Sequence, residues 1–258
     1  MAKRDIFGEI SEVLTEMGGA TSGHYGHAGR PGQRGGSAPS GGKKFGSSSI
    51  TGSKELDDDK SGINESVILE FADGSRGIFK SARDMKENGY GSAESEILAY
   101  EFSESIGWDI VPETIEYTYK GEGGSLQKWV PNSETAMDRR EFRPREWTPR
   151  FTIMDALLGN VDRHAGNVLY DEEGKMWAID NGGAFGFERF GRQKDWFWTG
   201  SIAAKTPENV GVAREVYSWF NSPKGTKYAN EVKETLGEES YYRFRSNVYV
   251  MADWAGSD

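Results

Sequence analysis

The chain has 258 residues, a net charge of -10 at pH 7, 12% aromatic residues and no cysteine. This aromatic content supports a folded core rather than a chain that is disordered throughout, and the missing cysteines exclude disulfides and thiolate metal sites. The acidic charge argues against nucleic acid or an anionic membrane surface as the main partner. Because no apolar run approaches the ~20 residues of a membrane span and no apolar signal segment opens the chain, we expect a cytoplasmic protein without an integral membrane segment.

The first 58 residues are predicted to lie outside the main folded domain. Residues 5–17 place apolar side chains at helical spacing before two glycines, which predicts an amphipathic helix within residues 1–17. Residues 18–58 are predicted to be a flexible linker, because residues 18–53 hold twelve glycines and no acidic residue. The segment HYGHAGRPGQRGGS resembles a Gly-rich stretch of phage head-associated proteins. This arm is therefore the candidate contact with a phage head or a host protein, which adds the virion to the expected locations.

The next part of the chain has the pattern of an antiparallel sheet with one helix. Strands are predicted at residues 67–71, 77–80, 115–119 and 125–130. The first two flank an Asp-Gly turn, and the last two flank a turn with three glycines, so each pair reads as a β-hairpin. Between the hairpins, residues 93–106 have helical spacing and end at Gly107. Residues 212–220 and 231–250 also have helical periodicity.

The stretch from residue 155 to 185 combines an apolar helix, a polar loop and a hairpin. The loop carries Asp162 and Asn167, and the second strand of the hairpin stops at Asp180. Asp162 and Asn167 have the D-x-x-x-x-N spacing of a kinase catalytic loop, and the D-N-G corner at Asp180 stands where those enzymes carry a metal-binding Asp. Amide and carboxylate oxygens suit Mg²⁺, and a second carboxylate can deprotonate an attacking hydroxyl. The stretch therefore predicts a phosphoryl-transfer site.

The segments GNVDRHAGNVLY (159–170) and AIDNGGAF (178–185) resemble the catalytic core of the phosphatidylinositol 3-/4-kinase-like superfamily. The similarity is to its type II phosphatidylinositol 4-kinase branch and to related small bacterial and phage kinases, which carry I-D-N-G at the metal corner. It extends over roughly residues 60–190 and implies an α+β, two-lobed protein-kinase-like fold. An antiparallel N-lobe sheet is expected in residues 59–131, and a mainly helical C-lobe in residues 132–258.

The resemblance implies a site for ATP with Mg²⁺ or Mn²⁺. Lys80 is expected to anchor the α- and β-phosphates and Glu96 to hold this lysine, with Glu94 as the competing partner. The segment 46–52 is an alternative to the expected phosphate-covering turn, which consists of Ser61, Gly62, Ile63 and Asn64. Trp129 offers a stacking surface within the expected adenine-binding strand end, which consists of Gln127, Lys128, Trp129 and Val130.

The resemblance also assigns roles in the catalytic loop and the metal corner. Asn167 and Asp180 are expected to ligate the metal, and Asp162 to position or deprotonate the acceptor hydroxyl. His164 is expected either to polarise the transferring phosphate or to hydrogen-bond the backbone beside the metal corner. Arg163 is expected to brace the loop by pairing with a carboxylate.

These residues predict a kinase that transfers the γ-phosphate of ATP to a hydroxyl acceptor. A protein Ser, Thr or Tyr side chain or a small alcohol is favoured over an inositol lipid, because the chain is acidic. Two alternatives stay open: adenylyl transfer with ATP in the flipped orientation, and a phage-related assembly or interaction protein that keeps the fold without turnover. The acceptor, like the oligomeric state, is not identified by the sequence.

Overall fold

The structure is a computed structural model that describes residues 44–56, 66–88, 91–139, 149–160, 162–185 and 205–256. The chain divides into two compact units, and all of these residues belong to the second unit, residues 43–258. The helix predicted within residues 1–17 and the phosphate-covering turn predicted at Ser61, Gly62, Ile63 and Asn64 lie outside the described residues.

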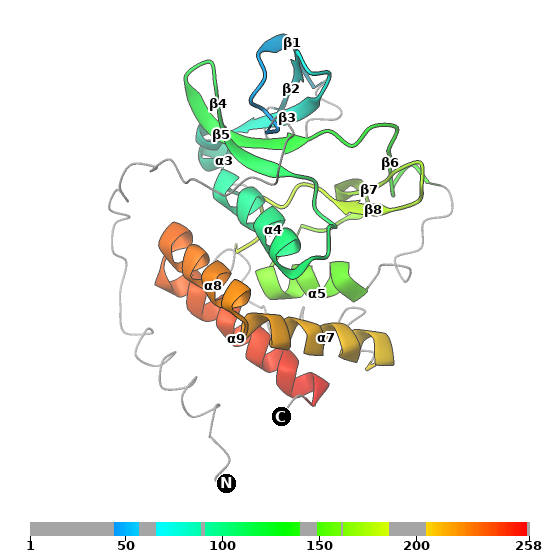
Figure 1. The fold of residues 1–258 in the computed structure, drawn as a ribbon, viewed down its shortest axis with the longest axis vertical. Helices are drawn as coiled ribbons and strands as arrows, with labels where there is room; N and C mark the ends of the chain where they lie inside the picture. The colour runs from blue at the N-terminus through cyan, green and yellow to red at the C-terminus, as the bar shows by residue number, and fades with distance from the viewer. Residues whose placement is uncertain are drawn as a thin grey trace. The chain divides into compact units, whose positions relative to one another are not determined.

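A five-stranded antiparallel sheet forms the first part of the described chain (Figure 1). Its strands are β1 (Ile50–Glu55), β2 (Ser66–Phe71), β3 (Arg76–Ser81), β4 (Thr114–Tyr119) and β5 (Glu122–Lys128), in the order β1-β2-β3-β5-β4. The turn between β2 and β3 is fixed by Asp73, whose carboxylate accepts hydrogen bonds from the hydroxyl (2.6 Å) and the backbone N–H (3.0 Å) of Ser75. These bonds lower the pKa of Asp73 to about 2. Both predicted hairpins are confirmed.

Strand β1 corrects part of the linker prediction. Its residues lie within the range 18–58 that the sequence predicts as a flexible linker, yet they pair with β2 along the sheet edge. The segment 46–52, the alternative phosphate-covering loop, runs into this strand. Gly46 precedes it with a φ of 72° and packs against side chains of β4 and β5. The Gly- and Ser-rich sequence becomes a strand because the exposed backbone of β2 offers it hydrogen-bond partners.

Helix α4 (Ala93–Ile106) follows the short helix α3 (Ala82–Asn88) and has the predicted bounds. Its first turn is capped by Ser92, whose hydroxyl accepts a hydrogen bond from the backbone N–H of Ser95 at 3.0 Å. Gly107 ends the helix in the left-handed conformation, with a φ of 80°, where a side chain would be disfavoured. Both ends are therefore set by residues that can be recognised in the sequence.

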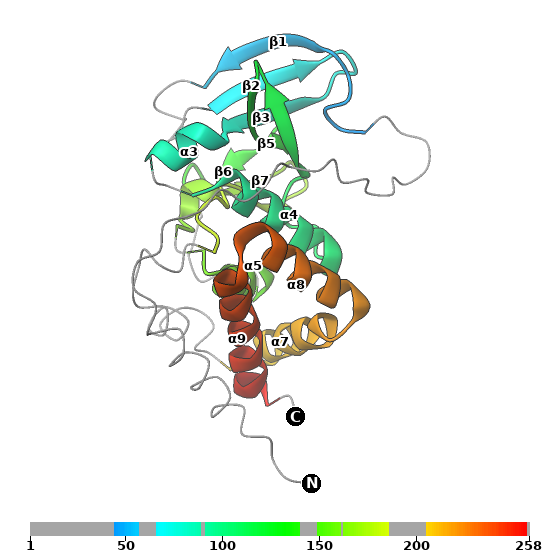
Figure 2. The same cartoon turned by 90° about the vertical axis from the view of Figure 1, so that its left-hand side faces the viewer.

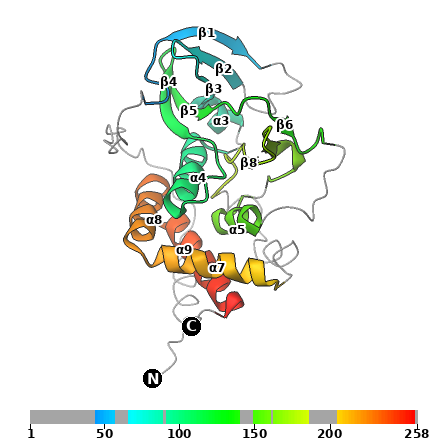
Figure 3. The same ribbon diagram turned by 45° about the vertical axis from the view of Figure 1, so that its right-hand side comes forward.

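The remaining elements form a small sheet, which Figure 3 shows above α5, and a set of helices beside and below α5. They are β6 (Glu134–Thr135), α5 (Pro149–Leu158), the one-turn helix η2 (Ala165–Asn167), β7 (Val168–Tyr170), β8 (Met176–Ala178), α7 (Pro207–Phe220), α8 (Pro223–Leu236) and α9 (Glu238–Ala255). The helical periodicity of residues 231–250 belongs to two helices rather than one, because Gly237, with a φ of 90°, separates α8 from α9. Among the helices of the described ranges, none combines the length and apolarity needed to cross a bilayer.

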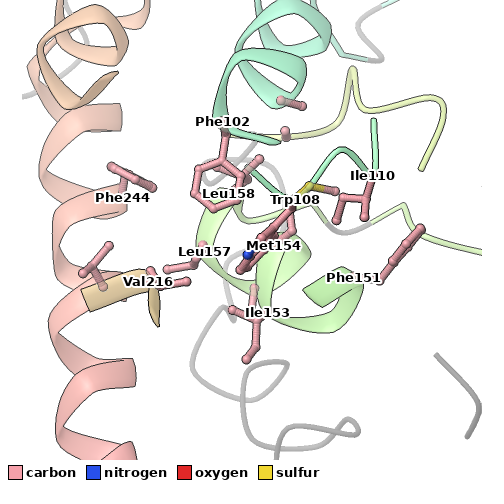
Figure 4. Close-up of a cluster of buried hydrophobic side chains, with 14 of the residues drawn as sticks. Phe102, Trp108, Ile110, Phe151, Ile153, Met154, Leu157, Leu158, Val216 and Phe244 are labelled. Atoms are coloured by element: carbon pink, nitrogen blue, oxygen red, sulfur yellow. The ribbon is translucent and has the colours of Figure 1, made fainter. Parts of the chain in front are cut away.

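Two hydrophobic clusters stabilise the fold, and α4 packs into the helical one. The sheet has a small core of its own, made of Phe45, Leu69, Phe71, Phe79 and Leu126. Phe102 of α4 instead lies at ring-centroid distances of 5.4 Å from Trp108, 5.1 Å from Trp219 and 5.7 Å from Tyr228. Figure 4 shows Phe102 above Leu157 and Leu158 of α5, and Figure 2 shows α4 beside α8. Helix α4 is thus anchored to the C-terminal helices.

We expect Phe102→Ala to lower the free energy of unfolding by about 3–5 kcal/mol, because Phe102 is fully buried and its ring contacts three other aromatic residues. Urea denaturation followed by circular dichroism measures this change. Met137→Ala is the control, since Met137 is 66% exposed and its replacement should change stability by no more than about 0.5 kcal/mol. Equal effects of the two variants would contradict the anchoring of α4.

Candidate active site

Lys80 of β3 is the centre of a cluster of charges drawn from three elements. Its ammonium nitrogen lies 2.7 Å from Oε1 of Glu96 in α4 and 2.7 Å from Oδ1 of Asp180, which follows β8. The Glu96 side chain is 2% exposed and that of Asp180 is 43% exposed. Glu94, the competing partner, is exposed to solvent. The structure therefore brings Lys80, Glu96 and Asp180 together.

The charges of this cluster stabilise one another. Burial by itself would lower the pKa of Lys80, but the carboxylates of Glu96 and Asp180 outweigh it and raise that pKa above its ordinary value. The positive charge of Lys80 in turn lowers the pKa of Asp180, against the opposing effect of burial. Lys80 is thus held as a cation and Asp180 as an anion at neutral pH.

Residues at the start of α4 form hydrogen bonds with the backbone of the turn that follows Asp180. The second carboxylate oxygen of Glu96 accepts a hydrogen bond from the backbone N–H of Asn181 at 3.0 Å. The hydroxyl of Ser95 donates to the carbonyl of Ala184 at 2.8 Å, and the N–H of Ser92 donates to the carbonyl of Gly182 at 3.0 Å. Glu96 thereby connects the lysine of the sheet with the backbone of the corner.

Two glycines allow this close approach: Gly182 belongs to the D-N-G corner recognised in the sequence, whereas Gly91 was not identified by sequence reasoning. A Cβ atom on Gly91 would lie 2.6 Å from the carbonyl carbon of Gly182, and Gly91 has a φ of 79°. A Cβ atom on Gly182 would lie 2.7 Å from Cε of Met85. Position 91 therefore requires glycine, both for its left-handed conformation and for the close approach of the Gly182 backbone, whereas at Gly182 an added Cβ would clash only with the flexible end of Met85.

The loop after α5 presents Asp162 at the surface and Asn167 in a buried position. The side-chain N–H of Asn167 donates to the carbonyl of Asp162 at 2.9 Å. This bond uses the amide N–H and orients the side chain, so the amide oxygen could ligate a cation. His164 is exposed, and its Nδ1 accepts a hydrogen bond from the N–H of Gly166 at 3.0 Å. Of the two expected roles of His164, this contact matches the backbone hydrogen bond.

Arg163 pairs with a carboxylate, as expected, and the partner is the buried Asp155 of α5 at 3.1 Å. Its guanidinium also donates to the carbonyls of Asn167 (2.7 Å) and Ile179 (2.5 Å) and to the side-chain oxygen of Asn181. Sequence reasoning did not identify Asp155. The available signal was a single acidic residue within the apolar helix segment IMDALL.

The predicted adenine-binding residues lie at the end of β5, and several of their groups are already used within the protein. The backbone N–H groups of Lys128 and Trp129 donate to carbonyls at 2.7 and 2.9 Å. The side chain of Gln127 donates to a threonine hydroxyl on β4 at 3.0 Å. The Trp129 ring lies 5.2 Å from the guanidinium of Arg76, and Val130 is buried. Adenine contact by this strand end stays a prediction.

Comparison with known proteins identifies relatives of this chain. Residues 124–252 match a family model described as phosphatidylinositol 3- and 4-kinase. The chain is 26% identical over 144 residues to protein Rv2133c of Mycobacterium tuberculosis, covering 42% of this chain and 52% of that protein. It is 33% identical over 95 residues to phosphatidylinositol 4-kinase gamma 3 of Arabidopsis thaliana, covering 34% of this chain and 15% of that protein. The chain therefore spans about half the length of the first relative and less of the second.

The fold is also similar to a solved structure, that of hydra Fam20 with sugar. The TM-score is 0.55 with 13% sequence identity, and the match covers 81% of this chain and 85% of that chain. At this identity the similarity concerns the fold alone. Together with the antiparallel sheet, the helices and the family match, it confirms the predicted α+β, two-lobed kinase-like fold.

We expect Lys80→Met to raise the pKa of the Asp180 carboxyl group toward its ordinary value, because the charge of Lys80 is the largest cause that lowers it. Carbon-detected NMR titration of the side-chain carboxyl in the presence of a chelator measures this pKa. Lys54→Met in the exposed strand β1 is the control and should leave it unchanged. An unchanged Asp180 pKa in Lys80→Met would show that the two side chains do not pair in solution.

Proposed function

Because this chain belongs to the phosphatidylinositol 3- and 4-kinase family, we propose that it is an ATP-dependent phosphotransferase that transfers the γ-phosphate to a hydroxyl group. The observation that carries the proposal is the position of Lys80 between Glu96 and Asp180, 2.7 Å from each. Phosphoryl transfer depends on charge neutralisation and positioning, and a lysine held by a buried glutamate supplies both for the α- and β-phosphates.

Asn167 and Asp180 have the donor chemistry that Mg²⁺ or Mn²⁺ requires. Asn167 offers an amide oxygen whose orientation is set by the bond to Asp162, and Asp180 offers a carboxylate that stays ionised. Within the described residues, no group of three His, Asp or Glu side chains is arranged to hold a metal. This fits a site in which nucleotide phosphates complete the coordination, as is usual for Mg²⁺. When bound, the metal would neutralise charge on the β- and γ-phosphates.

Asp162 is the group proposed to receive the acceptor proton. It is exposed in the loop after α5, and its backbone is held by hydrogen bonds to Asn160 (3.1 Å) and from Asn167 (2.9 Å). The acceptor oxygen forms a bond to the γ-phosphorus while the bond from that phosphorus to the β,γ-bridging oxygen breaks. The acceptor proton passes to the Asp162 carboxylate, and ADP leaves with the electron pair of the broken bond.

The acceptor that fits best is a protein Ser, Thr or Tyr side chain or a small alcohol. An inositol lipid fits less well, since the chain carries a net charge of -10 and an anionic membrane surface would repel it. We further propose that the reaction takes place in the cytoplasm. The N-terminal segment that precedes β1 is the proposed contact with a phage head or host protein.

We expect Asp162→Asn to reduce phosphate transfer by about 10²–10⁴-fold, because the amide cannot accept the acceptor proton. Purified protein is incubated with host lysate, metal ion and either γ-labelled or α-labelled ATP, and the labelled species is identified by mass spectrometry. Asp138→Asn is the matched control, since Asp138 is an exposed aspartate bonded to Thr135 outside the proposed site.

Three results would contradict the proposal in different ways. Labelling from α-labelled ATP, with the mass of an adenylate, would indicate adenylyl transfer. Labelling that persists in Asp162→Asn would assign the catalytic base elsewhere. Nucleotide binding without turnover on any acceptor would leave a protein that keeps the fold for assembly or interaction.

A further inference from the structure

Arg163 lies between the two segments that carry the proposed metal ligands. One guanidinium nitrogen donates both to the carbonyl of Asn167 at 2.7 Å and to the carbonyl of Ile179 at 2.5 Å. The first carbonyl belongs to a proposed ligand, and the second belongs to the residue directly before Asp180. A single side chain thus connects the backbone of η2 with the end of β8.

Asp180 is flanked on both sides by contacts to the same guanidinium. A second nitrogen of Arg163 donates to the side-chain oxygen of Asn181, the residue after Asp180. Asp180 itself has a φ of 54°, a left-handed conformation that non-glycine residues rarely adopt. Arg163 therefore holds both neighbours of a residue whose backbone conformation is unfavourable on its own.

The guanidinium of Arg163 is held in place by an ion pair with Asp155. The two side chains are only 1% and 2% exposed, and the carboxylate receives hydrogen bonds from two guanidinium nitrogens at 3.1 Å. Asp155 is part of α5, whose other buried side chains belong to the helical core. The planar fork of arginine can meet the carboxylate on one side and carbonyls on the other, which the point charge of lysine cannot.

We propose that Arg163 is a positioning residue that sets the spacing between the Asn167 and Asp180 ligands and so selects Mg²⁺ over Ca²⁺. This inference rests on the proposed function. Mg²⁺ requires nearly ideal octahedral geometry at about 2.0–2.1 Å, whereas Ca²⁺ accepts flexible geometry at about 2.3–2.6 Å. Because one nitrogen holds both backbone segments, the two ligand side chains cannot shift far relative to each other, which favours the ion that tolerates less displacement of its ligands. Groups that orient metal ligands in this way commonly change metal affinity when they are replaced.

The test measures binding of a non-hydrolysable ATP analogue with saturating Mg²⁺ or Ca²⁺, by calorimetry. In Arg163→Lys we expect the dissociation constant with Mg²⁺ to rise roughly tenfold, the lower end of the effect of removing a group that orients metal ligands. With Ca²⁺ we expect a change of about twofold or less, because its coordination tolerates displaced ligands. The double variant Asp155→Leu/Arg163→Met replaces the buried ion pair by apolar side chains of similar size, which commonly preserves folding. It should show the same shift.

Asp155→Asn separates positioning from a general loss of stability. This variant removes the negative charge but keeps an amide oxygen that can still accept from the guanidinium, so Arg163 stays anchored, its bonds to both carbonyls remain, and the ratio of the two dissociation constants should stay as in the wild type. Either of two results would overturn this inference alone. One is an equal rise of the dissociation constants with Mg²⁺ and Ca²⁺ in Arg163→Lys, and the other is a change of their ratio in Asp155→Asn as large as that in Arg163→Lys. A wild-type protein that binds the analogue with neither ion would instead overturn the proposed function. Arg245→Lys on the surface of α9 is the control for the substitution itself.

Discussion

The site depends on one buried carboxylate, that of Glu96. One of its oxygens pairs with the ammonium of Lys80, and the other accepts the backbone N–H of Asn181. An ionised carboxylate that is 2% exposed is costly unless both oxygens have partners, so any displacement of the strand or of the corner would leave a buried charge unsatisfied. A strand, a helix and a turn that are distant in sequence are therefore held in a single relative arrangement.

The packing of α4 connects the contacts of Glu96 with the hydrophobic core of the helices. Its residues Leu98, Ala99 and Phe102 belong to the helical core, and the Tyr228 hydroxyl of α8 donates to the carbonyl of Leu98 at 2.9 Å. The sheet that carries Lys80 has a separate and smaller core. Glu96 therefore pairs with a lysine of the sheet while its own helix packs in the helical core. The ion pairs of Lys80 connect the two hydrophobic clusters.

The sequence predicted those strands and helices that are determined by residues close to them in the chain. The β2–β3 hairpin follows from an Asp-Gly turn between apolar runs, and α4 follows from helical spacing that ends at Gly107. Strand β1 was missed because its six residues, ITGSKE, have no apolar alternation, only Ile50 and Thr51 favour strands, and all but Gly52 are exposed. It forms only through pairing with β2, which is a property of the folded sheet. Motif spacing pointed to Asp162, Asn167 and Asp180, whereas the expectations for Lys80 and Glu96 came from the family resemblance.

The partners within the site were less predictable, because they are chosen by contacts between segments far apart in the chain. Arg163 was expected to pair with a carboxylate, and nothing in its own loop distinguishes Asp155 from the many other acidic residues. The choice follows from burial: Asp155 is the one charged side chain within the buried face of α5, so a cation from the adjoining loop has to meet it there. Once that pair forms, the remaining guanidinium N–H groups are aimed at the carbonyls of Asn167 and Ile179. The backbone on both sides of Asp180 is thus held by a side chain from the loop after α5.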